Sequence, residues 1–133
     1  GIAQNSHPDI DVAALDLSGA QDIYYREYWL AGVCPKLTPA VAIIHFDGCV
    51  NHGSGRARKF LQRSVGAVED GAIGNKTLAA VASTPEEKII NSLSQIRTQF
   101  YRDIVNNDPS QSKFLNGWLT RISEVTAYAG TLV

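Results

Sequence analysis

A chain of 133 residues that is 44% hydrophobic and 19% charged is large and apolar enough to bury a core without cross-links. Its formal net charge of -1 gives no general attraction to nucleic acid or anionic lipid, so we expect no nucleic-acid partner. No apolar run approaches the roughly 20 residues of a membrane-spanning helix, so we expect a soluble globular protein without an integral membrane segment.

The chain is a succession of helical patterns separated by proline and glycine. About fifteen irregular residues, with a breaker at His7-Pro8-Asp9, come first. Apolar periodicity and capping residues then predict helices over about 18–30, 38–50, 55–65, 76–82, 85–105 and 114–125. The second of these helices is apolar nearly all round, which predicts that it is the central buried helix. No segment with a strand-like pattern is long enough to form a sheet. We predict an all-α fold, a compact bundle of about six helices in a single domain over residues 1–133.

The two cysteines, Cys34 and Cys49, are separated by most of the second predicted helix, which would hold them near opposite ends. A disulfide needs Cα atoms within about 7 Å, so this placement favours two free buried thiols, although the sequence leaves their pairing open. The chain has no zinc-type spacing of cysteine and histidine and no nucleotide-binding fingerprint. We therefore expect no metal and no cofactor.

Three polar residues gather where the second helix ends in a glycine-rich loop: Asp47, Asn51 and His52. A carboxylate on a buried helix needs a partner, so Asp47 either binds a neighbouring loop or faces a cleft. Asn51 either caps the end of the helix or contacts a ligand. His52 is either a surface histidine or part of a site.

An aromatic group made of Tyr24, Tyr25, Tyr28 and Trp29 marks the first helix. Such rings either pack in the core or offer flat faces on which sugar rings stack. Glu27 lies among them. A carboxyl group pressed against aromatic rings has the environment of a general acid, whereas a salt bridge to a nearby arginine would explain it equally well.

Five motifs occur in a specific order. They are Gly1-Ile2-Ala3-Gln4, the A-x-x-I-Y-x-x-x-Y-W pattern of Ala20 to Trp29, the F-D-x-x-V-N-x-G pattern of Phe46 to Gly53, Leu61-Gln62-Arg63 to Gly66 followed by Asp70-Gly71 to Thr77, and Gly117-Trp118 to Arg121. Together they resemble glycoside hydrolase family 108 with its predicted peptidoglycan-binding region. Members are phage endolysins and prophage relatives, some of them called secretion activators.

The resemblance implies a lysozyme-like fold in which residues 1–54 form the hydrolase-like part and residues 55–133 the peptidoglycan-binding-like part. It implies a muramidase that hydrolyses the β-1,4 bond from N-acetylmuramic acid to N-acetylglucosamine in bacterial peptidoglycan. Such an enzyme acts at the cell wall or periplasm and is made by a phage or a prophage-bearing bacterium. The loop with Gly71 and Gly74 has two interpretations, a turn that packs two helices together or a loop that contacts glycan.

In that family the catalytic glutamate lies in a Glu-Gly-Gly segment before the Gly-Ile motif, and this chain begins at Gly1. We therefore expect a chain truncated at its N-terminus relative to the enzyme, with no residue that matches the catalytic glutamate. Asp47 and Asn51 are the supporting candidates at the cleft. The substrate-binding candidates are Tyr24, Glu27, Tyr28, Asn51 and His52. The alternatives are a non-catalytic peptidoglycan-binding or virion structural module, or a structural partner of another protein; the oligomeric state is not predicted.

Overall fold

Six α-helices and no strands occur in the part of the chain that the computed structural model describes, residues 17–133. The α-helices are α1 Leu17–Tyr24, α2 Pro39–His52, α3 Ser54–Ser64, α4 Asn75–Ala82, α5 Glu86–Asn107 and α6 Ser112–Gly130. Three short helical turns join them: η3 Tyr25–Leu30, η4 Cys34–Lys36 and η5 Pro109–Gln111. The all-α prediction is confirmed. The Gly1-Ile2 motif and the His7-Pro8-Asp9 breaker lie outside the described residues.

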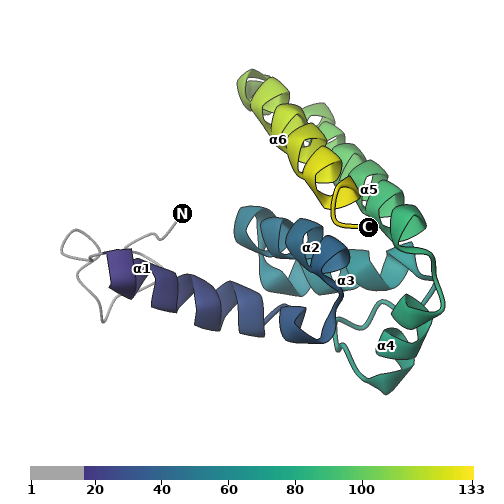
Figure 1. Cartoon of the computed structure of the whole chain (residues 1–133). Coiled ribbons are helices and arrows are strands. Elements are labelled where there is room, and N and C mark those ends of the chain that lie inside the picture. Colours follow the sequence, from purple (N-terminus) through teal and green to yellow (C-terminus); the bar gives the residue numbers. More distant parts are fainter. Residues whose placement is uncertain (1–16) are drawn as a thin grey trace.

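Helix α2 is the centre of the arrangement, as its sequence predicts. It packs against α3, α5 and α6, and Figure 1 shows the antiparallel α5–α6 pair leaning over the layer that α2 and α3 form. The core residues come from four helices: Ala40, Val41 and Ile44 of α2, Phe60 and Leu61 of α3, Ile89, Ile90 and Leu93 of α5, and Ala129 of α6. None of the described helices is long and apolar enough to cross a membrane.

The first predicted helix differs from the sequence prediction at its C-terminal end. Instead of one continuous α-helix to residue 30, α1 ends at Tyr24 and continues as the π-helical turn η3. Figure 1 shows this rod extending from the α2–α3 layer to one side of the molecule. π-Helical turns are rare in proteins, and those that occur are frequently found at functional sites.

Gln62 organises the loop between α3 and α4. Its side chain is fully buried, and its Nε2 lies within hydrogen-bond distance of Asp70 Oδ1 (2.8 Å), Ala72 O (3.0 Å) and Thr77 Oγ1 (3.2 Å). Its Oε1 accepts from the Gly71 backbone N–H at 2.8 Å. Gly71 has a φ of 78°, which favours glycine. These contacts are internal, so they favour the packing interpretation of the Asp70-Gly71 motif.

Replacing Gln62 with alanine should lower the free energy of unfolding by about 2–4 kcal/mol, because buried polar groups of the loop lose their partners and a cavity opens. Denaturant unfolding measures the loss. Gln95→Ala on the exposed face of α5 is the matched control, with an expected change within about 0.5 kcal/mol. Equal effects of the two changes would show that Gln62 does not hold the loop.

Candidate functional site

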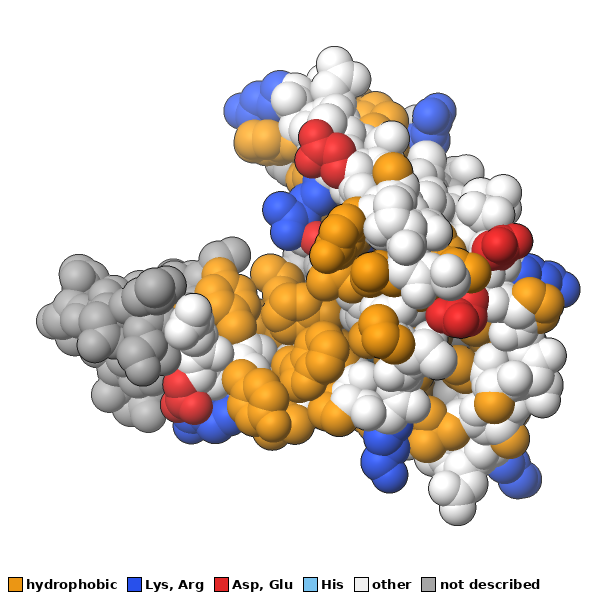
Figure 2. Space-filling view, viewed as in Figure 1, with side chains coloured by type: hydrophobic (Ala, Val, Ile, Leu, Met, Phe, Trp, Pro, Cys, Tyr) orange, Lys and Arg blue, Asp and Glu red, His pale blue; other side chains and the backbone are white. Residues whose placement is uncertain are grey.

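A groove of about 520 Å³ lies where α1 and η3 face α2 and α6. We call it the aromatic groove and define it by its lining residues: Gln21, Tyr24, Tyr25, Trp29, Phe46, Val50 and Arg121. Figure 2 shows hydrophobic side chains gathered in a band from α1 towards the middle of this face, below the recess that separates α1 from the α5–α6 pair. The groove is thus mainly apolar, with a cationic residue in its lining.

The aromatic rings of the groove remain accessible to solvent. No residue of η3 is buried, and 52% of Tyr25 is exposed. The Trp29 ring meets the Phe46 ring edge-on, with centroids 5.5 Å apart, and this contact joins η3 to α2. Tyr28 is not in the lining of the groove but packs against Tyr24, with ring centroids 5.5 Å apart. The rings therefore form an open wall whose faces are available to a flat ligand.

Side chains from α2 and α3 hold this wall in place by binding backbone carbonyl groups at the end of η3. The pairs are Ser54 Oγ with Glu27 O (3.0 Å), Arg58 Nη1 with Ala31 O (2.8 Å) and His45 Nε2 with Gly32 O (2.8 Å). Because a carbonyl oxygen only accepts, His45 Nε2 is the donor of its bond to Gly32 O. Carbonyl groups at the end of a helix need such partners, so the anchoring follows from helix chemistry.

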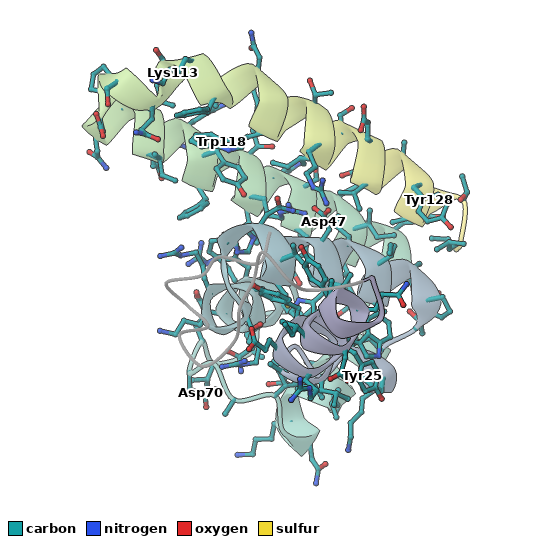
Figure 3. The ribbon with its side chains drawn as sticks, turned by 90° about the vertical axis from the view of Figure 1, so that its left-hand side faces the viewer. Tyr25, Asp47, Asp70, Lys113, Trp118 and Tyr128 are labelled. Carbon is teal, nitrogen blue, oxygen red and sulfur yellow. The ribbon has the colours of Figure 1, made fainter. Side chains whose placement is uncertain are left out.

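Asp47 lies beneath the groove, where α2 meets the α5–α6 pair (Figure 3). Its Oδ2 accepts from Arg97 Nη2 of α5 at 2.7 Å. Its Oδ1 accepts from Arg121 of α6, from Nε at 2.8 Å and from Nη2 at 2.7 Å. The side chains of Asp47 and Arg97 are only 9% and 3% exposed, whereas that of Arg121 is 56% exposed. One carboxylate thus ties three helices together and holds Arg121 at the groove.

The other predicted substrate-binding residues are distributed differently. Tyr24 lines the aromatic groove, whereas Glu27, Tyr28 and Asn51 are not among its lining residues. The Asn51 side-chain amide donates to the Asp47 backbone carbonyl of its own helix at 2.7 Å. The pKa of Tyr28 is raised by burial and further by the nearby Glu27 and Tyr24. The structure therefore brings Tyr24 to the groove and pairs Asp47 with the lining residue Arg121, whereas Glu27, Tyr28 and Asn51 do not line it.

His52 packs among aromatic rings rather than in the groove. Its ring centroid lies 5.1 Å from that of Phe60, 5.7 Å from Phe100 and 6.4 Å from Tyr101. Neither ring nitrogen has a hydrogen-bond partner among the described residues. Burial lowers the pKa of His52 to about 3, and the positive charges of Arg97 and Arg56 act in the same direction. At neutral pH the ring is therefore uncharged.

Cys34 and Cys49 are both buried and free, but the sequence argument that placed them far apart is wrong. The chain turns back before α2, through the left-handed backbone of Val33 and the short η4, and the two thiols interact. This interaction lowers the pKa of Cys49 and raises that of Cys34. The backbone of Gly32 also packs closely against Cys49, because a Cβ on Gly32 would lie 2.7 Å from Cys49 Sγ. Residues 17–133 contain no group of three or more metal-ligating side chains.

The two arginine partners of Asp47 were missed from the sequence. Arg97 occupies the buried face of α5, four residues after Leu93 and four before Tyr101. A basic residue within this apolar stripe was the sequence feature that could have indicated a buried ion pair. Arg121 belongs to the Gly117-Trp118 motif. Nothing in the sequence pairs it with a carboxylate 74 residues away.

Comparisons with known proteins cover nearly the whole chain. Residues 1–53 match the family model Glycosyl hydrolase 108, and residues 56–123 match the model Predicted Peptidoglycan domain. The structure of Brucella abortus SagA is similar, with 34% sequence identity and a TM-score of 0.83 over 92% of this chain and 70% of that chain. No curated protein gives a significant match.

The chain therefore belongs to the family of proteins that join a Glycosyl hydrolase 108 segment to a Predicted Peptidoglycan domain. It is a hydrolase-like protein that acts on peptidoglycan, at the cell wall. Both matched segments contribute to the site. The walls formed by α1, η3 and α2 come from the first segment, and Arg121 comes from the second.

Replacing Asp47 with asparagine should lower the free energy of unfolding by about 3–5 kcal/mol, because the buried guanidinium of Arg97 loses its counter-charge. The matched control is Asp22→Asn, which breaks the exposed Asp22–Arg26 pair (2.8 Å) and should cost at most about 1 kcal/mol. Urea unfolding of the variants and the wild type measures both. A loss for Asp47→Asn as small as that of the control would refute the buried role.

Stability should fall as the pH is lowered from 7 to 5, by on the order of 1–2 kcal/mol from His52 alone. The unfolded chain takes up a proton near the ordinary pKa of 6.5, whereas the folded state resists it until about pH 3, so acidification favours unfolding. His52→Leu removes this contribution. Unfolding midpoints at pH 7, 6 and 5 should therefore decline less steeply in the variant; parallel declines would contradict the assignment.

Proposed function

We propose that the protein is an endolysin-type muramidase, which hydrolyses the β-1,4 bond from N-acetylmuramic acid to N-acetylglucosamine, and that the aromatic groove binds the glycan strand. The observation that carries the proposal is the open aromatic wall of η3 on a Glycosyl hydrolase 108 segment. A phage or prophage origin and a lysozyme-like division into residues 1–54 and 55–133 belong to the same proposal.

The roles of the groove residues follow from their contacts. Tyr24, Tyr25 and Trp29 offer ring faces to successive sugars, and Tyr28 packs against the Tyr24 ring. Gln21 at the rim supplies an amide that hydrogen-bonds sugar hydroxyl or N-acetyl groups. We assign no sugar contact to His52, since it is enclosed by aromatic rings.

Asp47 has a positioning role in this proposal rather than that of the general acid. Both of its carboxylate oxygens already accept from arginine side chains, so neither is directed at a glycosidic oxygen. A general acid must deliver a proton to the leaving oxygen from within hydrogen-bond distance. We assign that step to the family's Glu-Gly-Gly glutamate, which the resemblance places before Gly1. Asn51 then acts indirectly, through the Asp47 carbonyl that it binds.

A non-catalytic peptidoglycan-binding or virion structural module is the second candidate. The observation that favours it is the composition of the groove, whose described lining residues include no carboxylate. Binding without cleavage requires only the aromatic wall and its polar rim.

Tyr25→Ala should weaken binding to purified cell-wall sacculi roughly 5- to 10-fold, because a stacking ring at the rim is lost. Tyr128→Ala is the matched control, since Tyr128 on α6 is 56% exposed, close to the 52% of Tyr25, but does not line the groove. Co-sedimentation at increasing sacculus concentration measures both affinities. Unchanged binding of Tyr25→Ala, or no binding by the wild type, would refute the groove assignment.

Product analysis separates the two candidate functions. The protein carrying the Glu-Gly-Gly segment is incubated with sacculi, and the new reducing ends are treated with borohydride. A muramidase yields muramitol, whereas a glucosaminidase yields glucosaminitol and a binding module yields neither. Replacing that glutamate with glutamine should abolish release while leaving co-sedimentation intact.

A further inference from the structure

We infer that Arg121 provides a carboxylate-binding site in the aromatic groove, and that the groove selects glycan bearing peptide stems over bare glycan. The inference rests on the proposed function, because it concerns the same groove. It adds the part of the substrate that the groove recognises, namely a carboxylate group on the short peptides that peptidoglycan carries and that neutral polymers of N-acetylglucosamine lack.

The first argument is the charge balance beneath the groove. Asp47 supplies one negative charge to two guanidinium groups, so this cluster carries a net charge of about +1. The buried Arg97 is enclosed together with the carboxylate, at 2.7 Å. The excess positive charge therefore lies towards solvent, on the more exposed Arg121.

The second argument is the geometry of Arg121. It uses Nε and Nη2 for Asp47, which leaves Nη1 outside that pair. Two contacts to Asp47 Oδ1 hold the planar guanidinium in place. The Arg121 side chain therefore loses less conformational freedom on ligand binding than an unrestrained arginine would. An arginine held in this way can bind a further carboxylate by donating short charge-assisted hydrogen bonds to it.

The third argument is the surroundings of the charge. Apart from Gln21, the remaining described lining residues are aromatic or aliphatic, and Arg121 is the charged member of that set. The apolar walls keep water from one side of the Arg121 guanidinium, while its 56% exposure leaves it open to an incoming carboxylate and to screening by salt. A groove for an uncharged sugar chain gains nothing comparable from a charged arginine. The combination indicates a ligand that is partly flat and apolar and partly anionic.

The experiment compares binding of the whole chain to three soluble glycan preparations, freed of other anionic wall polymers. The first carries its peptide stems. The second has lost them to an amidase, and the lactyl carboxylate that this cleavage exposes on each N-acetylmuramic acid is capped as a methyl amide. The third keeps its stems with every carboxylate capped in the same way. We expect the wild type to bind the first preparation about 10-fold more tightly than the other two. The preference should shrink as the salt concentration rises.

Arg121→Gln should reduce this preference to near unity, because the carboxylate loses its cationic partner in the groove. Arg121→Lys keeps the charge but not the planar geometry, so an intermediate preference is expected. The matched control is Arg102→Gln, which removes one charge from an exposed position of α5 outside the groove lining. Thermal unfolding of each variant verifies that the fold is retained, and Arg121→Lys decides the question if Arg121→Gln is unstable.

The outcomes distinguish this inference from the proposed function. Equal binding of stem-bearing and bare glycan by the wild type overturns the inference and leaves the glycan groove intact. A preference that survives in Arg121→Gln overturns it as well. Absence of binding to all three preparations refutes the groove itself.

Discussion

The arrangement of the helices depends on the ion pairs that the carboxylate of Asp47 forms with two arginines. This carboxylate lies on the central helix α2 and binds Arg97 of α5 through one oxygen and Arg121 of α6 through the other. A charge in this position is unfavourable unless it is paired, so the three side chains fix one another. Since α2 belongs to the hydrolase segment and the arginines to the peptidoglycan segment, the same interaction joins the two matched parts of the chain.

The opposite wall of the groove is held by different chemistry. Backbone carbonyl groups at the end of η3 and just beyond it bind side chains of α2 and α3, so the π-helical turn is fixed although its own side chains are not buried. The exposed rings thus belong to a segment whose backbone is fixed. A wall held in this way loses little conformational freedom when a ligand binds, which favours affinity.

Two motifs of the family have structural explanations in this chain. Gln62 and Asp70 hold the loop before α4 through hydrogen bonds within the protein. His52 fills an aromatic cluster beside α5 and carries no charge at neutral pH. By contrast, the aromatic motif of the first helix and Arg121 of the last motif meet in one groove, although nearly 100 residues of sequence separate them. The aromatic motif and the Arg121 motif, whose side chains are accessible in the groove, are therefore the ones that indicate function.

Much of the secondary structure was determined by the sequence itself, because helices depend on local periodicity and on capping residues a few positions apart. The buried character of α2 was predicted, and α2 and α5 begin one residue after the predicted positions 38 and 85. Only the tertiary structure decided which partners Asp47 has, 50 and 74 residues away, and that Cys34 folds back against Cys49. It also decided the π-helical turn that opens the aromatic wall. These features arise from packing between distant segments, which no local pattern of residues specifies.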